Sequence, residues 1–287
     1  MSASAEAGRP VADPSGAAPR RAQRLRLFAW QLVCVAVFFG IWEFGTRFPA
    51  LADNFNLFDP FFVSRPSLIL ARLYDWTVGA KAGFLWPHLW VTLEATLLGL
   101  AVSVVSGFLV GLLFSQKREL AVVFNPFIIA LNSVPRIAFV PLITMIFGLG
   151  LASKIVTAWF IVFFLVFFNT FKGGLSIERE LLDFCRTLGA NERQLVWTVR
   201  IPNALTWTFT ALPNAVSFSL IGVVISEFVG STTGMGYVII LSLSTSNASD
   251  MFAALAVLSL VGVSLVTIFQ MIERRLLRWS PEFREDT

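Results

Sequence analysis

The sequence predicts an all-α membrane protein, a polytopic bundle of about six transmembrane helices. Of its 287 residues, 56% are hydrophobic and 14% are charged, whereas a soluble domain has about a quarter of its residues charged. The apolar residues gather in stretches of roughly 20 residues or more, which is the length that spans a bilayer as a helix. Lipid tolerates this composition because apolar side chains can face outward without exposure to water.

Six apolar stretches are expected to cross the bilayer. The third is too long for one straight span and contains Pro126, Pro135 and Pro141. Each proline lacks the N–H that a helical hydrogen bond needs, so we expect a kinked or broken helix there. Such a break survives in a membrane only where protein or a water-filled cavity surrounds it. The predicted spans are 27–46, 88–114, 120–149, 152–171, 206–228 and 251–272.

The distribution of lysine and arginine predicts the orientation, because cytoplasmic loops carry an excess of both. With the N-terminus inside, 16 of the 22 basic residues fall in inside segments. An even number of spans brings the C-terminus back to the same side. We expect a disordered cytoplasmic tail at 1–26, where small residues and proline are frequent. A transmembrane domain at 27–280 and a C-terminal tail at 281–287 follow.

Composition also argues against several function classes. The net charge is +4, but the basic residues lie at the ends of apolar stretches, which favours a membrane surface over a nucleic-acid partner. Two distant cysteines and one histidine build neither a disulfide framework nor a metal site. The sequence has no GxxxxGK[ST] loop, so ATP is not bound by that mechanism. We expect no catalytic residue, metal or cofactor in this chain.

The longest internal polar segment, 172–205, reads KGGLSIERELLDFCRTLGANERQLVWTVRIPNAL. Its leucines and valines follow helical spacing that Gly189 interrupts. Asn191 is a good N-cap for a second piece, and Pro202 discourages the continuation of that piece. The segment therefore predicts two short amphipathic helices hinged at Gly189. Such helices either pack on the membrane surface or insert into a cleft of another protein.

The stretch DFCRTLGANERQLVWTVRIPNAL resembles the cytoplasmic signature of ABC importer permeases. That signature is Glu-Ala-Ala, three residues, Gly, nine residues, then Ile-x-Leu-Pro. Gly189 matches its glycine, and Val199 to Pro202 fall at the required spacing, while Asp183-Phe184-Cys185 replaces the opening Glu-Ala-Ala. Three further segments, 88–100, 125–150 and 226–237, resemble the nitrate/sulfonate/taurine-type subfamily.

The resemblance implies the fold of a type I ABC importer permease in a bacterial inner membrane, with both termini cytoplasmic. It also implies a translocation path for a small anionic or zwitterionic solute, such as nitrate, a sulfonate, taurine or bicarbonate. A pyrimidine or flavin precursor or an aromatic acid is the alternative solute. The implied partners are two copies of an ATPase that binds ATP and magnesium, an external solute-binding protein and a second permease copy. This chain itself would not be an enzyme.

The same resemblance assigns contact with the ATPase to the hinged segment. The implied coupling residues are Asp183, Phe184, Cys185, Arg186, Thr187, Leu188, Gly189, Ala190 and Pro202.

Charged and polar residues inside the spans form a second set of candidates, because such residues are costly in lipid. Arg136 either forms an ion pair with Glu94 or Glu227, or faces a cavity and attracts an anionic solute. Gly230, Gly234 and Gly236 are expected to form a turn at the outer end of the fifth span. Further polar residues either join helices or line the translocation path: Asn132, Ser133, Asn214 and Ser217.

Two rival functions remain open from the residues alone. An ion-coupled secondary transporter would need an internal repeat and carboxylates at mid-membrane. A membrane scaffold would recruit a cytoplasmic partner through the same polar segment without transporting a solute.

Overall fold

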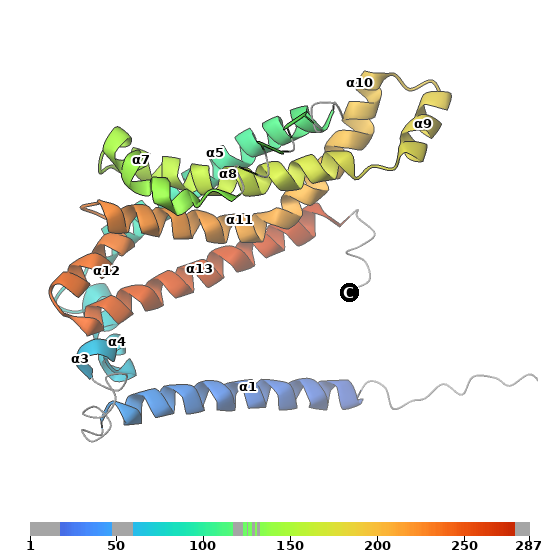
Figure 1. The fold of residues 1–287 in the computed structure, drawn as a ribbon. Coiled ribbons are helices and arrows are strands. Elements are labelled where there is room, and N and C mark those ends of the chain that lie inside the picture. The colour runs from blue at the N-terminus through green and yellow to red at the C-terminus, as the bar shows by residue number, and fades with distance from the viewer. Residues whose placement is uncertain are drawn as a thin grey trace, which may run out of the picture. The chain divides into compact units, whose positions relative to one another are not determined.

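The computed structural model describes residues 18–47, 60–116 and 133–278, together with positions 123, 124, 126, 127 and 130. Every regular element within these ranges is a helix, which confirms the predicted all-α class (Figure 1). The chain divides into two compact units, Met1–Leu68 and Ile69–Thr287.

The first unit contains the long apolar helix α1 (Ala18–Gly45) and the short helix α3 (Pro60–Val63). The carboxylate of Glu43 accepts hydrogen bonds from the Arg47 side chain at 2.7 Å and from the Ser67 backbone N–H at 3.0 Å. The bond from Ser67 connects the end of α1 to the first turn of α4 (Pro66–Thr77).

The start of α1 corrects one prediction. Residues 18–26 are helical, although they were expected to belong to a disordered tail over 1–26. Their alanine, arginine, glutamine and leucine are strong helix formers, and this propensity extends the apolar helix toward the N-terminus. Residues 1–17 lie outside the described ranges.

The second unit is built around four long helices that contain four of the predicted spans. These helices are α5 (Leu85–Ser115), α8 (Leu151–Leu175), α11 (Ile201–Val229) and α13 (Ala248–Leu276). Buried side chains from α5, α8, α11 and α13 form a common apolar core, which includes Leu100, Val162, Val166, Ala215, Val216 and Leu265.

Small residues set the close packing of α5 on α8. A Cβ atom added to Gly99 would lie 2.5 Å from the Ala158 Cβ, and one added to Gly107 would lie 2.9 Å from the Val166 Cβ. Helices in membranes pack closely where such residues let the backbones approach each other.

Five helices among the described residues are long and apolar enough to cross a membrane: Leu25–Gly45, Leu85–Ser115, Leu151–Leu175, Glu192–Val229 and Ala248–Leu276. The predicted third span, 120–149, is described only in part. From residue 133 onward it is broken, because Pro135 is extended and precedes the 3-10 turn η2 (Arg136–Phe139) and the short helix α7 (Val140–Phe147). Proline disfavours a helical conformation and removes a helical hydrogen bond at this point.

The sequence did not predict α12 (Met235–Ser244), a ten-residue apolar helix between α11 and α13. It is too short to span a bilayer, and it lies between the predicted spans 206–228 and 251–272.

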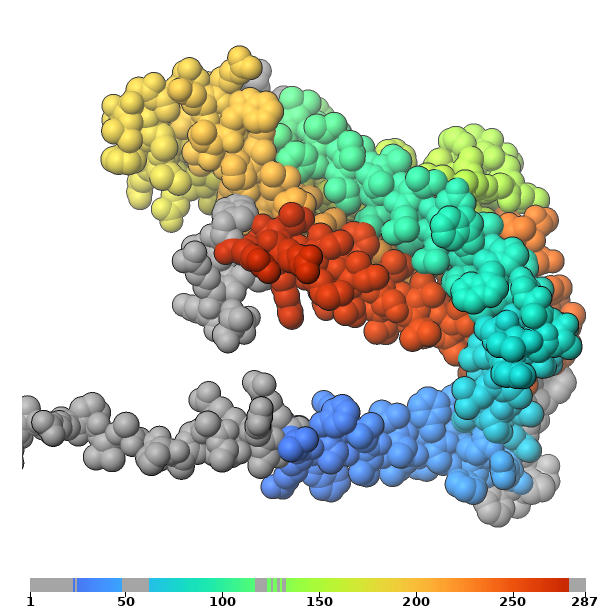
Figure 2. Space-filling view, turned by 180° about the vertical axis from the view of Figure 1, so that it is seen from behind, coloured from blue at the N-terminus to red at the C-terminus, as the bar shows by residue number. Residues whose placement is uncertain are grey.

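Two short helices, α9 (Arg179–Thr187) and α10 (Glu192–Leu195), lie at the end of the second unit that is remote from α12 (Figure 1). In the space-filling view, the yellow α9 and α10 project beyond the adjoining ends of α5 and α13 (Figure 2).

Candidate functional site

The candidate site is the projecting segment formed by α9, the turn after it and α10. α9 ends at Thr187 with Leu188 as its C-cap, and Gly189 follows with φ = +89°, a left-handed conformation that favours glycine. The Asn191 side chain then caps α10 by accepting from the Gln194 N–H at 2.9 Å. The Gln194 side chain accepts from the Asn191 N–H at 2.9 Å in return. The predicted pair of short helices with a turn at Gly189 is therefore present.

The predicted stop at Pro202 is wrong. A π-helical turn, Val196–Arg200, continues α10 directly into α11, and Pro202 lies in the first turn of α11. The helix continues past Pro202, and the π-helical turn directly before it is the local irregularity that accommodates a residue without an N–H.

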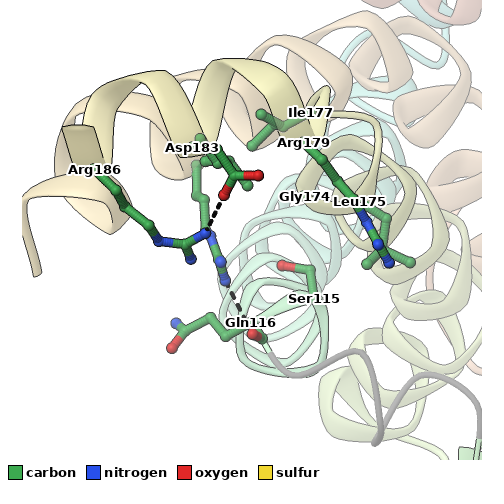
Figure 3. A pocket seen from close by; sticks show the side chains of 10 residues that line it. Ser115, Gln116, Gly174, Leu175, Ile177, Arg179, Asp183 and Arg186 are labelled. Carbon is green, nitrogen blue, oxygen red and sulfur yellow. Dashed lines mark hydrogen bonds and ion pairs between the residues drawn. The ribbon is translucent and has the colours of Figure 1, made fainter. Parts of the chain in front are cut away.

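Arg186 connects the two short helices across the turn. Its Nη1 donates to Asp183 Oδ1 at 2.8 Å, and its Nε and Nη2 donate to Glu192 Oε1 at 3.1 and 3.0 Å. Figure 3 shows the guanidinium turned toward Asp183. The hydrogen bonds that Arg186 donates, first to Glu192 and then to Asp183, raise the pKa of its guanidinium above the ordinary value. Arg186 therefore keeps its charge at any physiological pH.

α9 presents two different faces. One face lines a pocket with Arg179, Leu182, Asp183 and Arg186. The other face carries large apolar side chains that are mostly in the open, with exposed fractions of 47% for Leu181, 60% for Phe184 and 72% for Leu188.

The nine predicted coupling residues all lie in the described part of the chain, and eight of them are consecutive in α9 and its turn. Cys185, Ala190 and Pro202 are half-buried. The other six are exposed: Asp183, Phe184, Arg186, Thr187, Leu188 and Gly189.

The predicted path residues lie in two separate places. Arg136 is half-buried, with its guanidinium 4.9 Å from the centre of the Phe164 ring and Nη1 3.4 Å from the Ile161 carbonyl oxygen. Asn214 is exposed at the middle of α11, and the half-buried Ser217 donates to the Pro213 carbonyl at 3.1 Å. Ser133 is exposed, and Asn132 lies outside the described residues. In the described part of the chain, no side-chain hydrogen bond joins Asn214 or Ser217 to Ser133 or Arg136.

The predicted ion pair of Arg136 with Glu227 is wrong, because the cationic partner of Glu227 is Lys154. Lys154 Nζ lies 3.1 Å from Glu227 Oε1, and each residue is 1% exposed. The ion pairs found between described residues also do not join Glu94 to Arg136. Lys154 lies in the first turn of α8 and Glu227 near the end of α11. The sequence signal for this pair is a lysine at the start of one apolar helix and a glutamate at the end of another.

Lys154 and Glu227 belong to a larger buried polar cluster that fixes the turn before α12. Thr92 donates to Glu227 Oε1 at 3.0 Å, and the Gly236 N–H donates to Glu227 Oε2 at 2.7 Å. Lys154 Nζ donates to the Thr233 carbonyl at 2.6 Å. These bonds satisfy both buried charges, which is the condition under which a buried ion pair is tolerated.

The predicted glycine turn at 230–236 folds over this carboxylate. Gly234 has φ = +113°, and a Cβ atom there would collide with the Glu227 carboxylate. The Gly234 N–H donates to His88 Nδ1 at 3.1 Å. Within the described ranges, no group of three or more His, Cys, Asp or Glu side chains could hold a metal ion.

The profile of one protein family matches residues 103–278, and that family is described as the binding-protein-dependent transport system inner membrane component. The chain belongs to this family. It is thus a permease subunit of an ABC importer, as the resemblance of the 183–202 segment implied.

Curated relatives match this permease along most of its length. It is 31% identical to a probable ABC transporter permease protein of Haemophilus influenzae, over 84% of this chain and 92% of the relative. It is 28% identical to the formylaminopyrimidine transport permease protein ThiX of Halalkalibacterium halodurans, over 83% and 91% of the two chains. It is also 28% identical to the taurine transport system permease protein TauC of Escherichia coli, over 79% and 83%.

Solved structures support the fold of the permease. A chain of the MetNI methionine ABC transporter, in an inward-facing conformation, matches with a TM-score of 0.57 at 22% identity. The match covers 65% of this chain and 93% of that chain. The predicted type I importer fold is thereby confirmed.

Proposed function

We propose that α9, the Gly189 turn and α10 transmit ATP-driven movement from a separate ATPase to the transmembrane helices. The observation that carries this proposal is the exposed apolar face of α9, formed by Leu181, Phe184 and Leu188, on a segment that Arg186 holds together. Three large apolar side chains open to water on a short polar helix are typical of a surface that binds another protein.

The way this segment joins the transmembrane helices supports the proposal that movement of α9 and α10 is passed on to them. α10 continues without a loop into α11, the central helix of the core. At the same place, Arg200 Nη1 donates to the carbonyl of Gln116 at the end of α5, at 3.0 Å. A push on α9 would therefore act on α11 and α5 through helical backbone and a hydrogen bond, as rigid-element coupling requires.

The remaining parts of the proposal follow from family membership and from the basic-residue distribution. Both termini and the α9–α10 segment face the cytoplasm. Two ATPase copies bind the ATP and magnesium, a second copy of this permease completes the path, and an external binding protein delivers the solute. The chain itself carries no catalytic residue and no cofactor.

The proposed path runs along α11 at the exposed Asn214 and the half-buried Ser217, with Arg136, Ser133 and Asn132 on the preceding segment. An amide at the middle of a spanning helix is costly in lipid, so we place Asn214 toward water or protein. Arg136 would attract a small anionic or zwitterionic solute of the taurine or sulfonate kind. A pyrimidine or flavin precursor is the alternative, since the similar ThiX is named for formylaminopyrimidine transport.

Reconstitution tests the proposed function. Proteoliposomes that contain this permease, its ATPase and its binding protein should accumulate the solute only when ATP is present on the ATPase side. Proteoliposomes with the permease alone, under a proton or sodium gradient, should accumulate none. Gradient-driven uptake by the permease alone would contradict the proposal and favour a secondary transporter.

A further inference from the structure

A pocket of about 320 Å³ lies between α9 and the ends of two spanning helices. Ser115 and Gln116 line it from the end of α5, and Leu175 lines it from the end of α8. In Figure 3, Ser115 and Gln116 lie on one side of this space, and Asp183 and Arg186 of α9 lie on the opposite side. The pocket is thus enclosed by parts of the chain that are far apart in sequence.

The lining of the pocket is basic. Three arginines contribute to it, Arg179 and Arg186 from α9 and Arg200 from the turn before α11, against the single carboxylate of Asp183. That carboxylate accepts a hydrogen bond from Arg186 at 2.8 Å, so its charge is compensated within α9.

Arg179 and Arg200 supply positive charge that no carboxylate offsets in the described part of the chain. Their side chains make no ion pair among the described residues, and Arg200 donates only to the neutral carbonyl of Gln116. A guanidinium presents several N–H donors in a planar fork, which matches the oxygens of a phosphate group.

The position of the pocket along the spanning helices indicates which kind of phosphate group could reach it. The candidate spans Leu85–Ser115 and Leu151–Leu175 both end at residues that line the pocket. Because two candidate spans end at its lining, we place the pocket near the depth of the lipid headgroups. Basic pockets between helices on the cytoplasmic side of a membrane suit anionic headgroups.

We propose that this pocket binds a phosphate group, and that the phosphate belongs to an anionic phospholipid headgroup. Arg179 and Arg200 would hold the phosphate oxygens, so that the headgroup connects α9 to the inner ends of α5 and α8. The site goes beyond the proposed function, because the binding needs neither the ATPase nor a transported solute.

Lipid binding to the purified full-length chain tests this proposal. The chain is placed in phosphatidylcholine nanodiscs with or without phosphatidylglycerol, and bound lipid is counted by native mass spectrometry after release. The variants are Arg179→Gln, the double variant Arg179→Gln/Arg200→Gln, and the control Arg193→Gln. Arg193 is exposed in α10 and does not line the pocket.

The native chain and the control should retain phosphatidylglycerol, whereas Arg179→Gln should weaken its retention by about tenfold, the loss expected for one charge-assisted hydrogen bond. The double variant should weaken it further. Equal retention by the native chain, the control and both pocket variants would overturn the site. The native fold of each variant is checked by its thermal unfolding in the same nanodiscs.

The source of the phosphate is tested separately with inorganic phosphate added to pure phosphatidylcholine nanodiscs. Thermal stabilisation by phosphatidylglycerol and not by inorganic phosphate would support a lipid headgroup. Stabilisation by inorganic phosphate that disappears in Arg179→Gln would support the site with a soluble anion as its occupant. The absence of stabilisation by either one would overturn the proposal.

Discussion

Arg186, in the last turn of α9, holds Glu192, the first residue of α10, through two hydrogen bonds to one carboxylate oxygen at 3.1 and 3.0 Å. The left-handed Gly189 lies between these residues and reverses the chain. The two short helices are therefore connected both by backbone and by a charged side chain. They can transmit a push to α11 as one piece.

Replacing Gly189 with valine should uncouple ATP hydrolysis from the solute. The added Cβ meets no atom within 4 Å, so the cost is conformational: a β-branched residue at φ = +89° is strained by about 1–2 kcal/mol. Relief of this strain would change the angle between α9 and α10. Solute-stimulated ATP hydrolysis of the reconstituted complex should fall, while membrane insertion stays normal.

Gly189→Asn is the matched control, because asparagine tolerates a left-handed conformation better than other side chains. It should retain most of the stimulation. Equal stimulation in the native and Gly189→Val complexes would show that the turn is not part of the coupling.

Arg186→Gln should remove the connection across the turn without unfolding the chain. Exposed ion pairs contribute little to stability, so the thermal unfolding midpoint should not change. Solute-stimulated ATP hydrolysis should fall about fivefold or more, the lower range of typical coupling effects. The same assay on Arg193→Gln, whose side chain makes no ion pair among the described residues, should give the native rate. A native rate in both variants would exclude a role for the Arg186 connection.

Phe184→Ala should weaken ATPase binding. Phe184 is 60% exposed on the apolar face of α9 and should become buried in the partner, where removal of an aromatic side chain commonly costs about 2 kcal/mol or more. Co-purified ATPase, measured against permease, should fall by more than tenfold. Leu243→Ala, which shortens an equally exposed apolar side chain in α12, should leave the ratio unchanged. Parallel losses in the two variants would contradict a specific docking face.

Lys154→Met should be strongly destabilising, because it leaves the buried Glu227 carboxylate without its cation. Removal of one partner of a buried pair typically costs about 3–5 kcal/mol. The double variant Lys154→Met/Glu227→Gln should be more stable than the single variant, since an amide needs no counter-charge. Thermal unfolding in detergent measures both, with Lys172→Met as the control at the exposed end of α8. A double variant less stable than Lys154→Met would contradict this account of the cluster.

The sequence predicted the elements that depend on local signals. Gly189 and Asn191 predicted the turn and the cap of the coupling segment, and both lie where expected because left-handed backbone and helix capping are decided within a few residues. Pro135 likewise coincides with the broken helix before α7. The sequence did not predict the helical start of α1 at Ala18. The small residues and proline of the N-terminal segment indicated disorder, although residues 18–26 are rich in strong helix formers.

The relationships that depend on tertiary packing could not be read from one sequence. Lys154 and Glu227 are 73 positions apart, and only the packing of α8 on α11 brings them together. The turn over Glu227 fixes where the ten residues of α12 start. A search for stretches of about 20 apolar residues cannot detect so short a helix. The pocket beside α9 similarly required the ends of two separate spans to meet.

The side of the membrane that Leu188 faces tests the central claim most directly. In a chain with Cys34→Ser and Cys185→Ala, a Leu188→Cys variant and a separate Thr232→Cys variant are treated with a membrane-impermeant maleimide. The account predicts that Leu188→Cys is labelled only in inside-out vesicles, that bound ATPase protects it, and that Thr232→Cys is labelled only in right-side-out cells. Labelling of Leu188→Cys in intact right-side-out cells would contradict a cytoplasmic coupling segment.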